Sequence, residues 1–178
     1  MDAENPKPLV VRVTGALRLT TPADREIAMT RAFNAPRRLV FAAITKPHLL
    51  QRWLTGPPGW TMPVCQIDLR VGGAYRHEWS GPKGASMGIS GIFREIVVPS
   101  LVVATEKFDQ PWYPGEALVT NSLTEEAGEA ILTLTVLYES TEARDVALQF
   151  PMDSGVAASY ETLAALLPTL ETSKEATS

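Results

Sequence analysis

Short runs of alternating apolar and polar residues cover most of the chain. Between residues 25 and 33, the apolar residues Ile27, Met29 and Phe33 are all odd-numbered and so lie on one face of an extended chain, which is the pattern of a half-buried strand. Further runs of this kind follow Trp60, and short connections rich in Gly, Pro or acidic residues separate them. These predicted strands cover residues 62–70, 74–79, 87–98, 101–108, 117–124 and 130–138. Because the connections are short, we expect an antiparallel meander.

Two short helices are predicted between the first strand and the meander. Asn34 and Pro36 are typical of a helix start, and a helix should run from there to about residue 44. A second helix is expected over residues 48–54, opened by Lys46-Pro47, and the run GPPG at 56–59 should end it.

A longer helix is predicted from residue 153 to about residue 167. Val156, Tyr160, Leu163 and Leu167 are spaced by four, three and four residues, which places them on one helix face. Either Asp153 or Ser154 could cap this helix, and the proline at position 168 should end or kink it.

The order of elements predicts an α+β fold in which a curved antiparallel sheet of about six or seven strands surrounds the long C-terminal helix. The concave face of such a sheet is the large apolar surface against which the helical stripe can pack. Packing of this kind leaves room for a small apolar ligand between sheet and helix. Residues 25–170 are expected to form this domain, residues 1–24 an arm or an extra edge strand, and residues 171–178 a disordered tail.

Composition excludes several classes of function. The 16 basic and 20 acidic residues give a net charge of −4, and the basic residues are scattered, so nucleic-acid binding is not expected. One cysteine, Cys65, and two histidines, His48 and His77, rule out the usual zinc sites, and no cofactor or metal is predicted. The chain has neither a secretory signal nor an apolar run long enough to cross a bilayer, which predicts a cytoplasmic protein without stable membrane insertion.

Five local strings in this order resemble the START-like (Bet v 1-like, SRPBCC, helix-grip) superfamily, and within it the branch named for the activator of heat-shock protein 90 ATPase. They are RAFNAPRRLVF at 31–41, PHLLQRWL at 47–54, GGAYR at 72–76, GIFREI at 91–96, and STEARD at 140–145 followed by Met152. The resemblance implies a helix-grip domain with a hydrophobic cavity. It also implies an alternative function, a co-chaperone-like interaction with a chaperone, although the separate N-terminal domain of the family's namesake has no counterpart in the 24 residues before this domain.

Alternation and helical spacing predict which side chains line the cavity and bind a small hydrophobic or amphipathic molecule. Tyr75, His77 and Trp79 share one strand face, and His77 could serve as a polar anchor or be an ordinary core histidine. Trp60 and Trp112, in Pro/Gly-rich loops, are expected near the cavity mouth. The complete predicted set is Tyr75, His77, Trp79, Phe93, Phe108, Val119, Leu132, Leu134, Val156, Tyr160, Leu163, Trp60 and Trp112.

Signs of catalysis are weak. Glu95 and Glu106 lie on neighbouring predicted strands and could form an acid–base pair, but solvated surface charges are the commoner outcome. No Gly-x-Ser-x-Gly motif is present, and Cys65 lacks a basic neighbour that would activate it. An enzyme acting on an apolar substrate in the same cavity remains a third hypothesis, and the chain could be a monomer or a homodimer.

Overall fold

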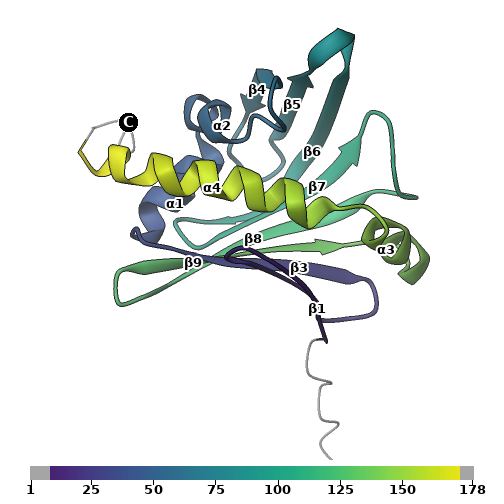
Figure 1. Ribbon diagram of the computed structural model, residues 1–178, viewed down its shortest axis with the longest axis horizontal. Coiled ribbons are helices and arrows are strands. Elements are labelled where there is room, and N and C mark those ends of the chain that lie inside the picture. Colours follow the sequence, from purple (N-terminus) through teal and green to yellow (C-terminus); the bar gives the residue numbers. More distant parts are fainter. Residues whose placement is uncertain (1–8, 173–178) are drawn as a thin grey trace, which may run out of the picture.

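A strongly curved antiparallel sheet wraps around one long helix (Figure 1). The computed structural model describes residues 9–172. The nine strands follow the order β1-β2-β3-β9-β8-β7-β6-β5-β4. They are β1 (Leu9–Thr14), β2 (Leu17–Thr21), β3 (Glu26–Phe33), β4 (Thr61–Ile67), β5 (Ala74–Ser80), β6 (Ser86–Val97), β7 (Leu101–Phe108), β8 (Ala117–Glu126) and β9 (Glu129–Leu137). The helices are α1 (Arg37–Thr45), α2 (Pro47–Trp53), the short 3-10 helix η1 (Pro82–Gly84), α3 (Thr141–Leu148) and α4 (Met152–Glu171).

The helix-grip fold predicted from the sequence is confirmed, with more strands than expected. β4 to β9 form the predicted meander, and β9 closes against β3, where Met29 lies opposite Leu134. The additional strands are β1 and β2, a hairpin that extends the sheet beyond β3. The segment before residue 25 thus contributes two strands within the described residues, while the part of the predicted arm over residues 1–8 lies outside them.

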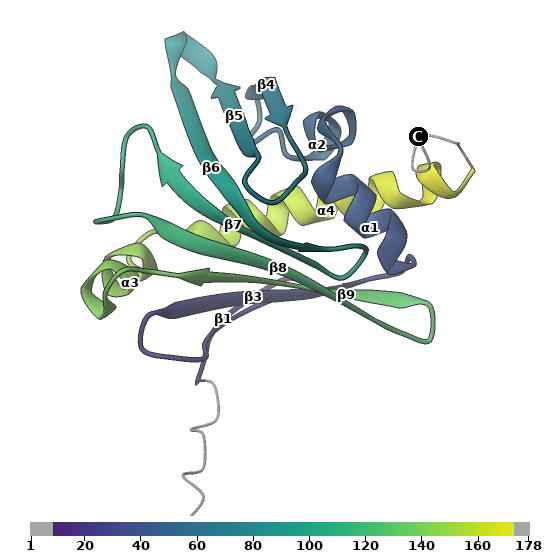
Figure 2. The same cartoon turned by 180° about the vertical axis from the view of Figure 1, so that it is seen from behind.

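α1 and α2 lie at one end of α4, and α3 lies at the other, as the reverse view shows (Figure 2). α1 packs against β8, β9 and α4, so it closes that end of the space between sheet and helix. Asn34 does not cap α1 as predicted, because the helix begins one residue after Pro36, whose extended backbone occupies the capping position without a side-chain hydrogen bond. α2 begins at Pro47, where a missing N–H costs nothing.

α3 was not among the predicted elements. Its eight residues carry only Ala143 and Ala147 as buried side chains, so the apolar stripe that would signal a helix is short and weak. The cap is nevertheless well formed, since the backbone N–H of Ala143 donates to the Ser140 hydroxyl at 3.0 Å.

α4 buries the predicted stripe, including Tyr160, Leu163 and Leu167, against the concave face of the sheet. It starts at Met152 and continues three residues past Pro168 to Glu171, so that proline does not end the helix. Residues 173–178, most of the predicted tail, lie outside the described residues.

Asp153 anchors α4 to the N-terminal strand and does not cap the helix. Its carboxylate accepts hydrogen bonds from the Arg12 guanidinium at 2.6 Å and from the Thr14 hydroxyl at 2.8 Å. Arg12 also donates to the carbonyl oxygens of Leu148 and Phe150, where α3 meets α4. Burial acts to raise the pKa of Asp153, but the hydrogen bonds from Arg12 and Thr14 outweigh it and hold that pKa below its ordinary value.

Arg12→Ala is expected to lower the free energy of unfolding by about 2 kcal/mol near neutral pH, because it leaves a buried carboxylate without its cation. The contribution of Asp153 is complete above its unfolded-state pKa and is lost as the pH falls through its lowered folded-state pKa, so the two proteins should converge in acid. Urea titration of both proteins measures this difference. Arg18→Ala, which removes an exposed arginine of β2, is the matched control, and an equal effect of the two substitutions would contradict the anchoring role.

Candidate functional site

A cavity of about 530 Å³ lies between the concave face of the sheet, α2 and α4. Its walls are mostly apolar and aromatic. β5, β6 and β7 form one side, β3, β8 and β9 form the floor, and the first turns of α4 form the opposite side. The size and the lining are those of a small-molecule pocket.

The structure places ten of the thirteen predicted residues on the wall of this cavity. They are Tyr75, His77, Trp79, Phe93, Phe108, Val119, Leu134, Val156, Tyr160 and Trp112. They lie together because β5, β6 and β7 keep the alternation that the sequence shows, and because the α4 stripe faces the sheet.

Leu132, Leu163 and Trp60 lie elsewhere. Leu132 and Leu163 are fully buried in the hydrophobic core and do not line the cavity. α1 packs against both β9 and α4, the elements that carry these two leucines. Trp60 packs over Gly81, where a Cβ atom would overlap the indole ring. It borders a neighbouring hollow, which shares Trp79, Met87, Phe108 and Trp112 with the cavity.

The aromatic face of β5 is continuous. The centroid of the His77 ring lies 5.1 Å from that of Tyr75 and 5.9 Å from that of Trp79. The Trp79 indole N–H donates to the carbonyl oxygen of Leu54 at 2.7 Å, which fixes this wall to the end of α2. The one polar atom of the Trp79 side chain therefore has a partner inside the protein.

His77 is different, because neither of its ring nitrogens has a hydrogen-bond partner among the described residues. The residue is only 8% exposed and lines the cavity. Burial lowers the pKa of His77 to about 4, since the charged imidazolium would lose its hydration. A neutral imidazole therefore presents one donor and one acceptor, both unpaired, at the cavity wall.

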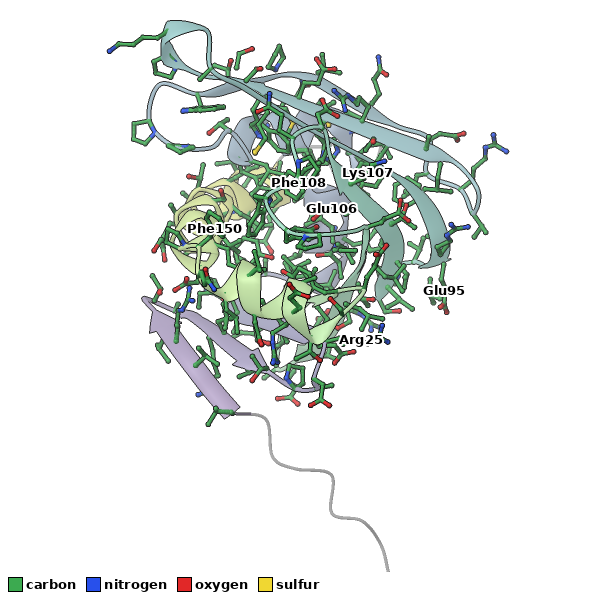
Figure 3. The ribbon with its side chains drawn as sticks, turned by 90° about the vertical axis from the view of Figure 1, so that its right-hand side faces the viewer. Arg25, Glu95, Glu106, Lys107, Phe108 and Phe150 are labelled. Carbon is green, nitrogen blue, oxygen red and sulfur yellow. The ribbon has the colours of Figure 1, made fainter. Side chains whose placement is uncertain are left out.

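Glu106 is a second polar, half-buried residue on the wall, and its carboxyl group makes no side-chain hydrogen bond or ion pair within residues 9–172. Burial raises its pKa to about 7. Glu95 is exposed on the outer surface of β6, and Figure 3 shows the two carboxylates in different places, Glu106 in the interior and Glu95 at the outer edge. The structure does not bring them together as an acid–base pair.

Sequence reasoning passed over Glu106 as a cavity residue although a signal was available. Phe108 was assigned to the cavity, and Glu106, Ala104 and Val102 have the same parity along β7. All four line the cavity. Glutamate side chains are usually exposed, so the residue type favours a surface position for Glu106 even though its parity along β7 is that of Phe108.

Cys65 lies opposite His77 in the β4–β5 pairing. Burial raises the pKa of its thiol to about 11, so the thiol is protonated at neutral pH and is a poor nucleophile.

Arg76, on the other face of β5, makes two contacts with the Asp109 carboxylate, at 2.6 and 2.5 Å, and one with Glu78 at 3.0 Å. These charges belong to the outer surface, as alternation along β5 predicts.

A model of the family "Activator of Hsp90 ATPase homolog 1-like protein" matches residues 34–168. The chain belongs to this family. A comparison with curated proteins gives no match.

Solved structures of bacterial proteins share the fold of this family member. A protein from Rhodobacter sphaeroides is 30% identical, with a TM-score of 0.79 over 85% of this chain and 98% of that one. A protein from Chromobacterium violaceum is 27% identical, with a TM-score of 0.65 over 82% and 98% of the two chains. A protein from Nitrosomonas europaea, 23% identical with a TM-score of 0.74 over 85% and 99%, supports the fold alone. The resemblance to the START-like superfamily is thereby confirmed.

Within the described part of this family member, no group of three or more His, Cys, Asp or Glu side chains could hold a metal ion. A search of the helices in the same residues finds none with the length and apolar character needed to cross a membrane.

Replacement of His77 by leucine is expected to reduce the loss of stability in acid. In the wild-type protein the unfolded chain binds a proton near pH 6.5 and the folded chain only near pH 4, so the contribution of His77 is complete above 6.5 and is lost as the pH falls toward 4. The difference in the free energy of unfolding between the wild-type protein and the His77→Leu variant should therefore change by about 2 kcal/mol between pH 6.5 and pH 4. Urea titrations at several pH values measure it. His48→Gln, which removes an exposed imidazole, is the control, and a variant difference that does not depend on pH would contradict the assignment.

Proposed function

We propose that this protein binds a small hydrophobic or amphipathic molecule in the cavity between its sheet and α4. The observation that carries the proposal is the cavity itself: about 530 Å³ lined by apolar and aromatic side chains in the middle of the fold. Apolar surface of this kind gains free energy when a ligand removes it from water, at about 25 cal/mol per Å².

The arrangement of hydrogen bonds supports a binding site more than a loosely packed core. The cavity-lining side chains Tyr75, Trp53 and Trp79 each donate to a main-chain carbonyl oxygen, at 2.8, 2.9 and 2.7 Å, so the aromatic walls are held in place. Both ring nitrogens of His77, by contrast, have no hydrogen-bond partner among the described residues, and the half-buried Glu106 lies on the same wall. A rigid apolar wall with a few unpaired polar groups is the usual composition of a small-molecule site.

Titration with Nile red, a neutral apolar dye, tests the proposal. The dye should bind the wild-type protein with one site and raise its melting temperature, because a ligand that binds only the folded state stabilises it. Absence of both signals would count against a cavity open to ligands.

Ser159→Trp is expected to weaken Nile red binding at least about tenfold, because an indole at this half-buried position of the cavity wall occupies space that the dye needs. Ala158→Trp is the matched control, since it adds the same side chain to the exposed face of α4 outside the cavity. Fluorescence titration of the two variants measures the ratio. Equal affinities would mean that the dye binds outside the cavity.

The interaction with a chaperone that the resemblance implied stays a prediction. The family takes its name from activation of the Hsp90 ATPase. Co-purification of this protein with a chaperone of that class would be the direct test.

A further inference from the structure

Among residues 9–172, the Glu106 carboxyl group is the one acidic side chain on the wall of the cavity described above, and no Lys or Arg of these residues stands on that wall. A carboxylate in an apolar cavity loses much of its hydration and needs a proton, a water molecule or a cation as compensation. Within residues 9–172, none of the hydrogen bonds or ion pairs reaches this group. The cavity therefore presents an acceptor whose partner the described chain does not supply.

Three basic residues of the sheet, one each on β7, β5 and β3, are directed elsewhere. Lys107 follows it on β7 and is exposed on the opposite face of the strand. Arg76 lies on the outer face of β5, where Asp109 and Glu78 bind its guanidinium. Arg31 lies beneath α4 and pairs with Glu161 at 2.8 Å. A positive charge for Glu106 must come from outside these residues.

The walls around this carboxyl group suit a cation on an apolar body. Trp53, Trp79 and Trp112 all line the cavity, together with Tyr75 and Tyr160. Aromatic faces attract ammonium groups through their quadrupole, and they bury apolar surface equally well. His77 is neutral at physiological pH, so it neither competes for Glu106 as a cation nor repels one.

We propose that the cavity selects amphipathic amines, with the ammonium group of the ligand paired to the Glu106 carboxylate and its apolar body against the aromatic walls. The proposal rests on the proposed function, since it names the ligand class of the same cavity. His77 adds an unpaired acceptor and donor for a second polar group of the ligand. Carboxylic acids such as fatty acids are disfavoured, because their charge would enter a cavity that holds an acidic group and no basic one.

A matched set of probes tests the selectivity. 2-(Naphthalen-2-yl)ethylamine, 2-(naphthalen-2-yl)ethanol and naphthalen-2-ylacetate share one ring system and differ in the charge of the side chain. Each would displace Nile red from the protein of residues 1–178 at about pH 8, where the amine is still protonated. The amine should bind at least about tenfold more tightly than the alcohol, and the acetate more weakly than both.

Glu106→Gln is the decisive variant, because it removes the charge and keeps the shape. It should bring the affinities of amine and alcohol to within about threefold while leaving that of the alcohol near its wild-type value. Glu95→Gln, an exposed glutamate of β6, should leave all three affinities unchanged. Circular dichroism of each variant checks that it is folded.

The outcomes separate the two proposals. If Nile red and the alcohol bind but the amine has no advantage, or if Glu106→Gln keeps that advantage, selection of amines is overturned and the apolar cavity stands. If neither the dye nor any naphthalene probe binds, both proposals fail.

Discussion

Gly91→Ala is expected to destabilise the protein by about 3 kcal/mol, the largest change in stability that we predict. Gly91 lies in β6 opposite Tyr75 of β5, and the Tyr75 hydroxyl reaches past it to donate to the carbonyl oxygen of Thr105 at 2.8 Å. A Cβ atom at position 91 would overlap that carbonyl oxygen and stand 2.5 Å from Cε1 of Tyr75. The backbone of β7 cannot move aside without breaking its pairing, so the clash has no inexpensive relief.

Gly155→Ala is the matched control for this substitution. Gly155 lies within α4, and no atom lies within 4 Å of the Cβ that alanine would add. This variant should be stabilised by about 0.5–1 kcal/mol, because glycine is the costlier residue inside a helix. Urea unfolding of both variants measures the contrast. Similar free energies of unfolding for the two would show that β6 adapts and that Gly91 is not required to seat Tyr75.

Glu106→Gln is expected to raise the free energy of unfolding by about 2 kcal/mol at about pH 8. Burial raises the folded-state pKa of Glu106 from 4.5 to about 7. The folded protein thus binds this proton more tightly than the unfolded chain. Its stabilising contribution is complete below about pH 4.5 and is lost as the pH rises through 7. Glutamine is neutral throughout and avoids that loss.

The pH dependence distinguishes this effect from a simple change in packing. Near pH 4.5 the folded wild-type protein holds a protonated Glu106, which resembles glutamine, so the variant should gain little there. Urea titrations at the two pH values give the comparison, with Glu95→Gln as the control for loss of an exposed carboxylate. A gain of the same size in acid and at pH 8 would mean that Glu106 does not ionise in an apolar environment.

Selection of amines and the gain in stability of Glu106→Gln have the same physical origin. A carboxylate that costs free energy to bury in an apolar cavity is one that a bound ammonium group can compensate. The wild-type residue would then reduce stability in return for ligand selectivity, a trade that is common at functional sites.

Much of this fold follows from patterns that are local in the sequence. Alternation along residues 62–138 predicted the meander, because a strand with one buried face must repeat every two residues. The spacing of Val156, Tyr160 and Leu163 predicted α4 for the corresponding helical reason. The same parity placed Tyr75, His77 and Trp79 on one face, and the structure has all three on the cavity wall.

The sequence could not determine how each face is closed, because that depends on contacts between distant segments. Leu132 and Leu163 have the parity and spacing of cavity residues, yet both are buried in the hydrophobic core. The elements that carry them, β9 and α4, both pack against α1. Asp153 looked like a helix cap and instead binds Arg12, 141 residues earlier in the chain.

The polar chemistry of the cavity wall also depends on contacts between distant segments. Local patterns indicated the strands of the meander, the long helix and ten of the residues that line the cavity, since side-chain periodicity is a property of each element alone. Whether Glu106 meets a basic partner, or His77 a hydrogen-bond partner, depends on which side chains the other strands and α4 bring beside them. Only the tertiary structure leaves both groups unpaired in an apolar space, and that is what gives the cavity its chemistry.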